Sequence, residues 1–169
     1  SETEIFWLVM TGLLWFVRDF HFFAEESPLN PYWFQQVSYY SLYFAVAASL
    51  SFCVAFLKLP NYRRIIVVLF AIGVALCIFR AAITSTNRTD LATSLATLGV
   101  SLVICGLMVA DWLRHRTLES AALIAIMLFT TALGFHDVGR IPNVNWWQGL
   151  GFHIQPYTGL LLFSVFLLS

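Results

Sequence analysis

The chain has 169 residues, of which 60% are hydrophobic and only 11% are charged, and its mean hydropathy is +0.81. Soluble domains carry about a quarter charged residues, so this composition excludes an ordinary soluble domain and is typical of a protein in lipid. The formal net charge is zero, and nothing in it suggests nucleic-acid binding. A membrane-spanning helix needs roughly 20 residues, so the chain has room for about five to seven of them.

Six apolar stretches follow one another, separated by short polar connections. Because backbone amides in hydrocarbon must be paired internally, and because the runs do not alternate as barrel strands do, each stretch is predicted to be a helix. We therefore expect an all-α fold, a polytopic transmembrane helix bundle with six spans in one domain of residues 1–169. Since the chain begins just before one span and stops inside another, we also expect it to be a fragment. The stretches cover residues 5–23, 33–57, 65–83, 91–113, 118–135 and 151–168.

Basic residues near the ends of the spans predict the orientation in the membrane. Lys58, Arg63 and Arg64 lie between the second and third stretches, and Arg114 and Arg116 lie between the fourth and fifth. We expect these two short loops in the cytoplasm and the other three connections on the outer side. The lipid bilayer is then the partner of most of the chain's surface.

Three of the four histidines are expected at one depth near the outer face, on three different helices. His21 ends the first span, His136 ends the fifth, and His153 opens the sixth. Asp19 and Asp137 lie close in sequence to two of them, and such a carboxylate fixes the tautomer of a metal-binding imidazole. Each histidine alone is more simply an interface residue bonded to a carbonyl or water, but the carboxylates near two of them weaken that interpretation for the three together. If the three converge, Zn²⁺ or Cu²⁺ would suit them, with haem held by two of them as a less favoured variant.

Arg18 and Arg80 lie towards the same side and need partners. One interpretation is a pair of ion bridges to Asp19 or Asp137 that hold helix ends together. The other is a clamp for the carboxylate or phosphate of a ligand, and the spacing does not choose between them.

A further candidate, Trp147, lies in the Trp-, Asn- and Gly-rich segment of residues 139–152, which is expected either on the membrane surface or folded back as a lid. No Walker loop, nucleophile elbow or zinc-protease helix motif occurs, so no catalytic site is expected in this chain. The candidate ligand-binding residues are therefore Arg18, Asp19, His21, Arg80, His136, Asp137, Trp147 and His153.

Two motifs resemble a known family. The first is Leu-Trp-Phe-Val-Arg-Asp-Phe-His at residues 14–21, and the second is Gly-Phe-His-Asp at residues 134–137. Gln-Pro-Tyr at residues 155–157 and an apolar run at residues 160–168 follow them. Together they resemble the membrane domain of bacterial seven-transmembrane receptors with diverse intracellular signalling modules, and most closely that of sensor histidine kinases and diguanylate cyclases.

This resemblance implies a sensor domain in the bacterial inner membrane that comprises spans two to seven of the receptor. It implies a cytoplasmic output domain in the same polypeptide after Ser169, either a histidine kinase or a diguanylate cyclase, and a homodimer. Arg18, His21, His136 and Asp137 match the family motifs, whereas His153 and Trp147 do not.

Two other functions stay open. The first is a small-solute transporter or a membrane-embedded metal or haem protein. A transporter is expected to show inverted repeats and polar residues near the midplane, and the sequence shows neither clearly. The second is a structural anchor that only dimerises its attached domains.

Overall fold

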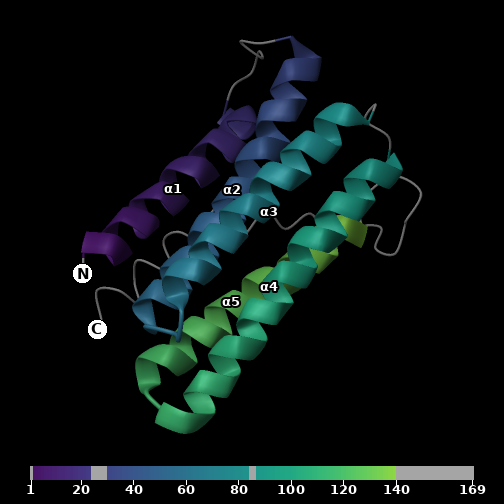
Figure 1. The fold of residues 1–169 in the computed structure, drawn as a ribbon. Coiled ribbons are helices and arrows are strands. Elements are labelled where there is room, and N and C mark those ends of the chain that lie inside the picture. Colours follow the sequence, from purple (N-terminus) through teal and green to yellow (C-terminus); the bar gives the residue numbers. More distant parts are fainter. Residues whose placement is uncertain (1, 24–29, 84–86, 140–169) are drawn as a thin grey trace. The chain divides into compact units, whose positions relative to one another are not determined.

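The structure, a computed structural model, describes residues 2–23, 30–83 and 87–139, except for the side chains of residues 19–23, 31, 87, 88, 133 and 136–139. These residues form helices and no strand, which confirms the all-α prediction for the described part of the chain (Figure 1). The helices are α1 (Glu2–Phe23), α2 (Pro31–Phe56), α3 (Tyr62–Ala82), α4 (Asn87–His115) and α5 (Leu118–Gly139).

Each of the five helices begins and ends within four residues of an apolar stretch predicted from the sequence. The largest differences are at the start of α4 and the end of α5, where the helices extend into polar sequence. The sixth predicted stretch, residues 151–168, lies outside the described residues, so the count of six spans stays a prediction.

Three of the helices are long and apolar enough to cross a membrane, over Tyr32–Phe56, Tyr62–Ala82 and Thr89–His115. Helices α1 and α5 have 22 residues each, about 33 Å of helix at 1.5 Å per residue, and so match the bilayer core in length. The length and apolar character of these helices indicate that the chain is a multi-pass membrane protein.

Short local motifs set the helix ends. The side chain of Asn30 accepts a hydrogen bond from the backbone N–H of Tyr32 at 3.0 Å, which caps the start of α2. At the end of α4, Arg116 has φ of 50°, and its N–H donates to the carbonyl of Trp112 at 2.7 Å. This left-handed residue closes the helix, and Lys58, with φ of 50°, follows α2 in the same backbone conformation.

The chain divides into two compact units, and the first is Ser1–Cys77. In it α1 packs against α2, where the Ser38 hydroxyl donates to the backbone carbonyl of Arg18 at 3.2 Å. Phe70 of α3 contacts Trp7 of α1 and Phe44 of α2, with ring centroids 5.1 and 5.9 Å apart. The buried residues of α1 are spaced as one helix face, at Glu4, Thr11 and Trp15.

The second unit, Ile78–Ser169, contains α4 and α5, which pack together as an antiparallel pair (Figure 1). They approach closely at Gly134, where a Cβ atom would lie 2.7 Å from Cδ2 of Leu98. The buried residues of α5 again follow helical spacing along the face towards α4, at Ser120, Leu123, Ile124, Met127 and Thr131.

The helices also carry a large apolar exterior. Val67 and Ile78 of α3 are 69% and 64% exposed, and Val103 of α4 is 65% exposed. Soluble monomers rarely expose apolar surface of this extent, whereas a helix facing lipid must do so. Hydroxyl groups in the helices are bonded to their own backbone four residues earlier, which satisfies them without water, at Thr11, Ser49, Ser51, Thr93, Thr97, Ser101, Thr130 and Thr131.

Candidate functional site

Arg80 is a buried charge at the end of an apolar helix. It lies in the last turn of α3, where a cation interacts favourably with the exposed carbonyls of the helix C-terminus. The residue is only 1% exposed. Charged side chains within membrane helices are costly and rare, so a buried one is by default a candidate functional residue whose partner must be identified.

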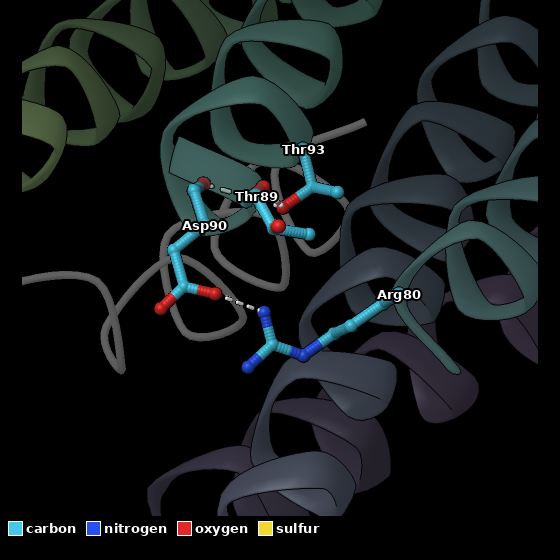
Figure 2. A network of polar contacts seen from close by, with 4 residues as sticks. All are labelled: Arg80, Thr89, Asp90 and Thr93. Carbon is cyan, nitrogen blue, oxygen red and sulfur yellow. Dashed lines mark hydrogen bonds and ion pairs between the residues drawn. The ribbon is translucent and has the colours of Figure 1, made fainter. Parts of the chain in front are cut away.

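The partner is Asp90 (Figure 2). Nη1 of Arg80 donates to Oδ1 of Asp90, and the two side chains form an ion pair. Asp90 belongs to the first turn of α4, where backbone N–H groups favour a carboxylate. The Arg80 side chain has no exposed surface, whereas that of Asp90 is 11% exposed. The pair therefore ties the end of α3 to the start of α4, with its carboxylate on the more accessible side.

A threonine fixes the turn that carries Asp90. The Thr93 hydroxyl donates to the carbonyls of Thr89 and Asp90, at 3.0 and 3.2 Å. Thr89 and Thr93 are themselves buried, and Figure 2 shows them beside the ion pair. Because the first carbonyls of α4 are bonded in this way, Asp90 is held on a formed helical turn rather than on a loose loop.

The ion pair has two chemical consequences. A charge pair out of water is strongly coupled, since removing one partner leaves the other buried and uncompensated. The same pair contributes little net stability compared with apolar packing, so it is better suited to specifying an arrangement than to strengthening one.

His136 and Asp137 lie on α5 of the same unit. Gly134 is opposite Leu98, and the two helices are antiparallel, so His136 corresponds to about residue 96 of α4. Asp90 is six residues farther towards the start of α4, about 9 Å along the axis. The backbones of His136 and Asp137 are thus less than two helical turns from the level of the ion pair, while their side chains are outside the described part.

The other predicted site residues are described only in part. Arg18 is half-buried near the end of α1, and its carbonyl accepts the Ser38 hydrogen bond. Asp19 and His21 belong to α1 by their backbones, but their side chains are outside the described part. The remaining two candidates, Trp147 and His153, lie outside the described residues altogether. The structure therefore describes the side chains of Arg18 and Arg80 among the eight candidates.

No group of three or more His, Cys, Asp and Glu residues that could hold a metal ion occurs among the described side chains. The proposed ligands His21, His136 and His153 are not among those side chains, so the metal hypothesis stays a prediction. The one described imidazole is that of His115, whose Nε2 lies 3.7 Å from Oδ1 of Asp111 at the opposite end of α4.

The sequence argument missed Asp90. It assigned residues 84–90 to an outer connection and considered only Asp19 and Asp137 as partners of Arg80. Helix α4 begins at Asn87, four residues earlier than predicted, which brings Asp90 into its first turn. The short connection between α3 and α4 was the available signal, because opposite charges in the last and first turns of consecutive helices are close to each other.

The sequence matches a known protein family. A family described as 7TM diverse intracellular signalling matches residues 5–169, nearly the whole chain. Comparison with curated proteins gives no match, and neither does comparison with solved structures.

Proposed function

We propose that this chain, which belongs to the 7TM diverse intracellular signalling family, is the membrane-embedded sensing part of a bacterial receptor. It detects a small ligand or a metal ion near the extracytoplasmic ends of its helices. It passes that signal through the bilayer to a cytoplasmic output domain. Family membership supports the role in signalling, and the arrangement of charged residues supports the location of the site.

The buried Arg80–Asp90 pair is the observation that carries this proposal. Apolar helices of a signalling membrane protein retain a fully buried guanidinium at the end of α3, against a carboxylate at the start of α4. We propose that the pair has a closed and an exchanged arrangement, and that a ligand shifts their populations through a difference in affinity for the two. A signal that acts on the pair changes how the ends of α3 and α4 are held together.

The proposed site also includes residues of α1, of α5 and of the segment that follows α5. We propose that Arg18, Asp19 and His21 from α1, and His136 and Asp137 from α5, act near this outer level. Trp147 and His153 come from the segment that follows. In the metal version, the three histidines bind Zn²⁺ or Cu²⁺, with the carboxylates fixing their tautomers. Haem between two of them is the less favoured version.

Three helices are long and apolar enough to cross a membrane. We propose that α1 and α5 also span the bilayer, that residues 151–168 form a sixth span, and that this span carries the change to the output domain. The basic turns with Lys58, Arg63 and Arg64, and with Arg114 and Arg116, then face the cytoplasm of the inner membrane. The receptor works as a homodimer whose output domain is a histidine kinase or a diguanylate cyclase.

Two observations test the proposal. The coding sequence after residue 169 should contain a His-bearing dimerisation helix or a Gly-Gly-Asp/Glu-Glu-Phe segment. In addition, alanine replacement of the outer set in the full-length receptor should abolish the response while the protein remains in the membrane at wild-type level. Full signalling by that variant would contradict the sensing role and leave only a structural anchor. The replaced set is Arg18, His21, Arg80, His136, Asp137 and His153.

A further inference from the structure

The carboxylate of Asp90 binds the guanidinium of Arg80 in the way that a free anion would. One carboxylate oxygen accepts from Nη1 of a guanidinium that has no exposed surface. A guanidinium recognises carboxylate and phosphate oxygens through this charge-assisted geometry. From this contact, and resting on the proposed function, we infer that Asp90 is an internal anion, and that an oxyanion from outside binds by displacing it from Arg80.

The accessible side of the pair agrees with such an exchange. The Asp90 side chain retains 11% exposure, whereas Arg80 has none, so an approaching anion meets the carboxylate first and reaches the guanidinium only after the carboxylate moves. The first turn of α4 adds its own N–H groups to the positive potential around the site. With Asp90 in place the charges balance, because the C-terminus of α3 offsets the N-terminus of α4. Once the carboxylate leaves, the buried guanidinium is uncompensated, which favours an anionic ligand over a cation.

The hydrogen bonds of Thr93 hold the turn that carries Asp90 together. They tie the carbonyls of Thr89 and Asp90 to the helix, so the Asp90 turn shifts as a formed turn when its carboxylate leaves Arg80. The ligand therefore converts a direct link between α3 and α4 into a link through the bound oxyanion. This is the differential contact that a population shift requires.

Competition within the chain sets the affinity. A tethered carboxylate on a neighbouring helix turn acts at an effective concentration of about millimolar or more, so wild-type protein binds a free anion weakly. Asp90→Asn removes the competing charge at nearly constant size. Arg80→Gln removes the recognising group. The two variants therefore change anion affinity in opposite directions. A merely structural pair would also leave an uncompensated guanidinium in Asp90→Asn, so the deciding observation is an anion-dependent shift of the wild-type protein that Arg80→Gln loses. A wild-type protein without such a shift overturns the inference.

The experiment uses the full-length receptor in nanodiscs and measures the shift of its thermal unfolding midpoint with added inorganic phosphate, or with acetate, against chloride at equal ionic strength. We expect Asp90→Asn to bind the preferred anion about tenfold more tightly than wild type, and Arg80→Gln to lose at least tenfold. Arg80→Lys keeps the positive charge, so its affinity for the anion should lie between those of wild type and Arg80→Gln. Asp111→Asn and Arg114→Gln, at the other end of α4, should behave as wild type.

Comparing phosphate, acetate and lipid composition identifies the source of the anion. Phosphate alone or acetate alone points to a free ligand of that class. A shift that instead follows the phosphatidylglycerol content of the nanodiscs points to a lipid headgroup. Equal anion binding by wild type, Asp90→Asn and Arg80→Gln, with all three folded, overturns the inference.

The outcome separates this inference from the proposed function. If both variants change the output of the receptor but anion binding does not follow Arg80, the internal-anion inference fails and the sensing role stands. If anion affinity depends on Arg80 but neither variant changes the output of the receptor, the anion site stands and the sensing role of this pair fails. A lower unfolding midpoint of Asp90→Asn is compared with the midpoint of Arg80→Lys, because the lysine variant retains both charges of the pair.

Discussion

Gly134 of α5 lies so close to Leu98 of α4 that a Cβ atom at the glycine would be 2.7 Å from Cδ2 of the leucine. This approach sets the register of the antiparallel pair. It lies one turn before the end of α5, where the backbones of His136 and Asp137 are found. The close packing of the two helices thus determines the level at which two of the candidate site residues leave α5.

A larger residue at this point should separate the helices. We expect Gly134→Leu to destabilise the folded protein by about 1–3 kcal/mol, because the side chain must displace Leu98 in a packed contact. Thermal unfolding in detergent micelles, followed by tryptophan fluorescence, measures the effect. Gly99→Leu is the matched control, since a Cβ there meets nothing within 4 Å. Equal unfolding of the two variants would show that α4 and α5 do not pack closely here.

The Arg80–Asp90 pair should behave as a coupled unit. Removing either partner, by Arg80→Gln or Asp90→Asn, should cost about 3–5 kcal/mol, because one buried charge is left without its partner. The double variant should lose less than the sum of the two single losses, by about 0.5–3 kcal/mol. A double-mutant cycle of unfolding free energies measures the coupling. Additive losses would mean that the two residues do not interact in the membrane.

The basic turns should face the cytoplasm. In a background without Cys53, Cys77 and Cys105, a single cysteine at an exposed position reports the side on which it lies. We expect Arg63→Cys and Arg114→Cys to resist a membrane-impermeant maleimide on intact cells and to react after lysis.

The opposite result is expected on the outer side. Asn30→Cys should react on intact cells, because α2 begins there and ends at the turn that carries Lys58. The same labelling pattern at Asn30 and Arg63 would contradict the predicted topology, and a reversed pattern would invert it.

The metal version of the site has its own test. Elemental analysis of the purified full-length protein should find bound Zn or Cu, and His136→Ala should remove it because one of three imidazole ligands is lost. His115→Ala is the control, since His115 is exposed at the other end of α4. Unchanged metal content in His136→Ala, or metal lost equally from both variants, would rule out this version.

The helices could be predicted from the sequence because hydrocarbon admits few alternatives: a long apolar run must satisfy its own backbone, and a helix does so. The ends of the helices were predicted less accurately than the helices themselves. Hydropathy follows the apolar residues alone, whereas α4 begins at Asn87 and includes Asp90, since the first turn of a helix tolerates polar side chains well. Gly134 permits a close helix approach, but its contact with Leu98 depends on side-chain packing, which hydropathy does not predict.

The sequence predicts a depth for the candidate residues but no direction for their side chains. Apolar and polar runs indicate how far along a helix a residue lies, and they predict Arg80 near the end of its helix, where the structure has it. They do not give the direction in which a side chain points. Asp90 was therefore assigned to a loop, while carboxylates beside histidines were favoured. The convergence of the histidines stays a prediction for the same reason.

The most direct test of the central claim is the output of the full-length receptor in its native membrane, measured as phosphorylation or as cyclic dinucleotide formation according to the domain encoded after residue 169. We predict that Arg80→Gln and Asp90→Asn change basal or stimulated output at wild-type protein level. Arg114→Gln and Asp111→Asn should leave output unchanged. Wild-type output from both outer variants would contradict the claim that signals act through the buried pair.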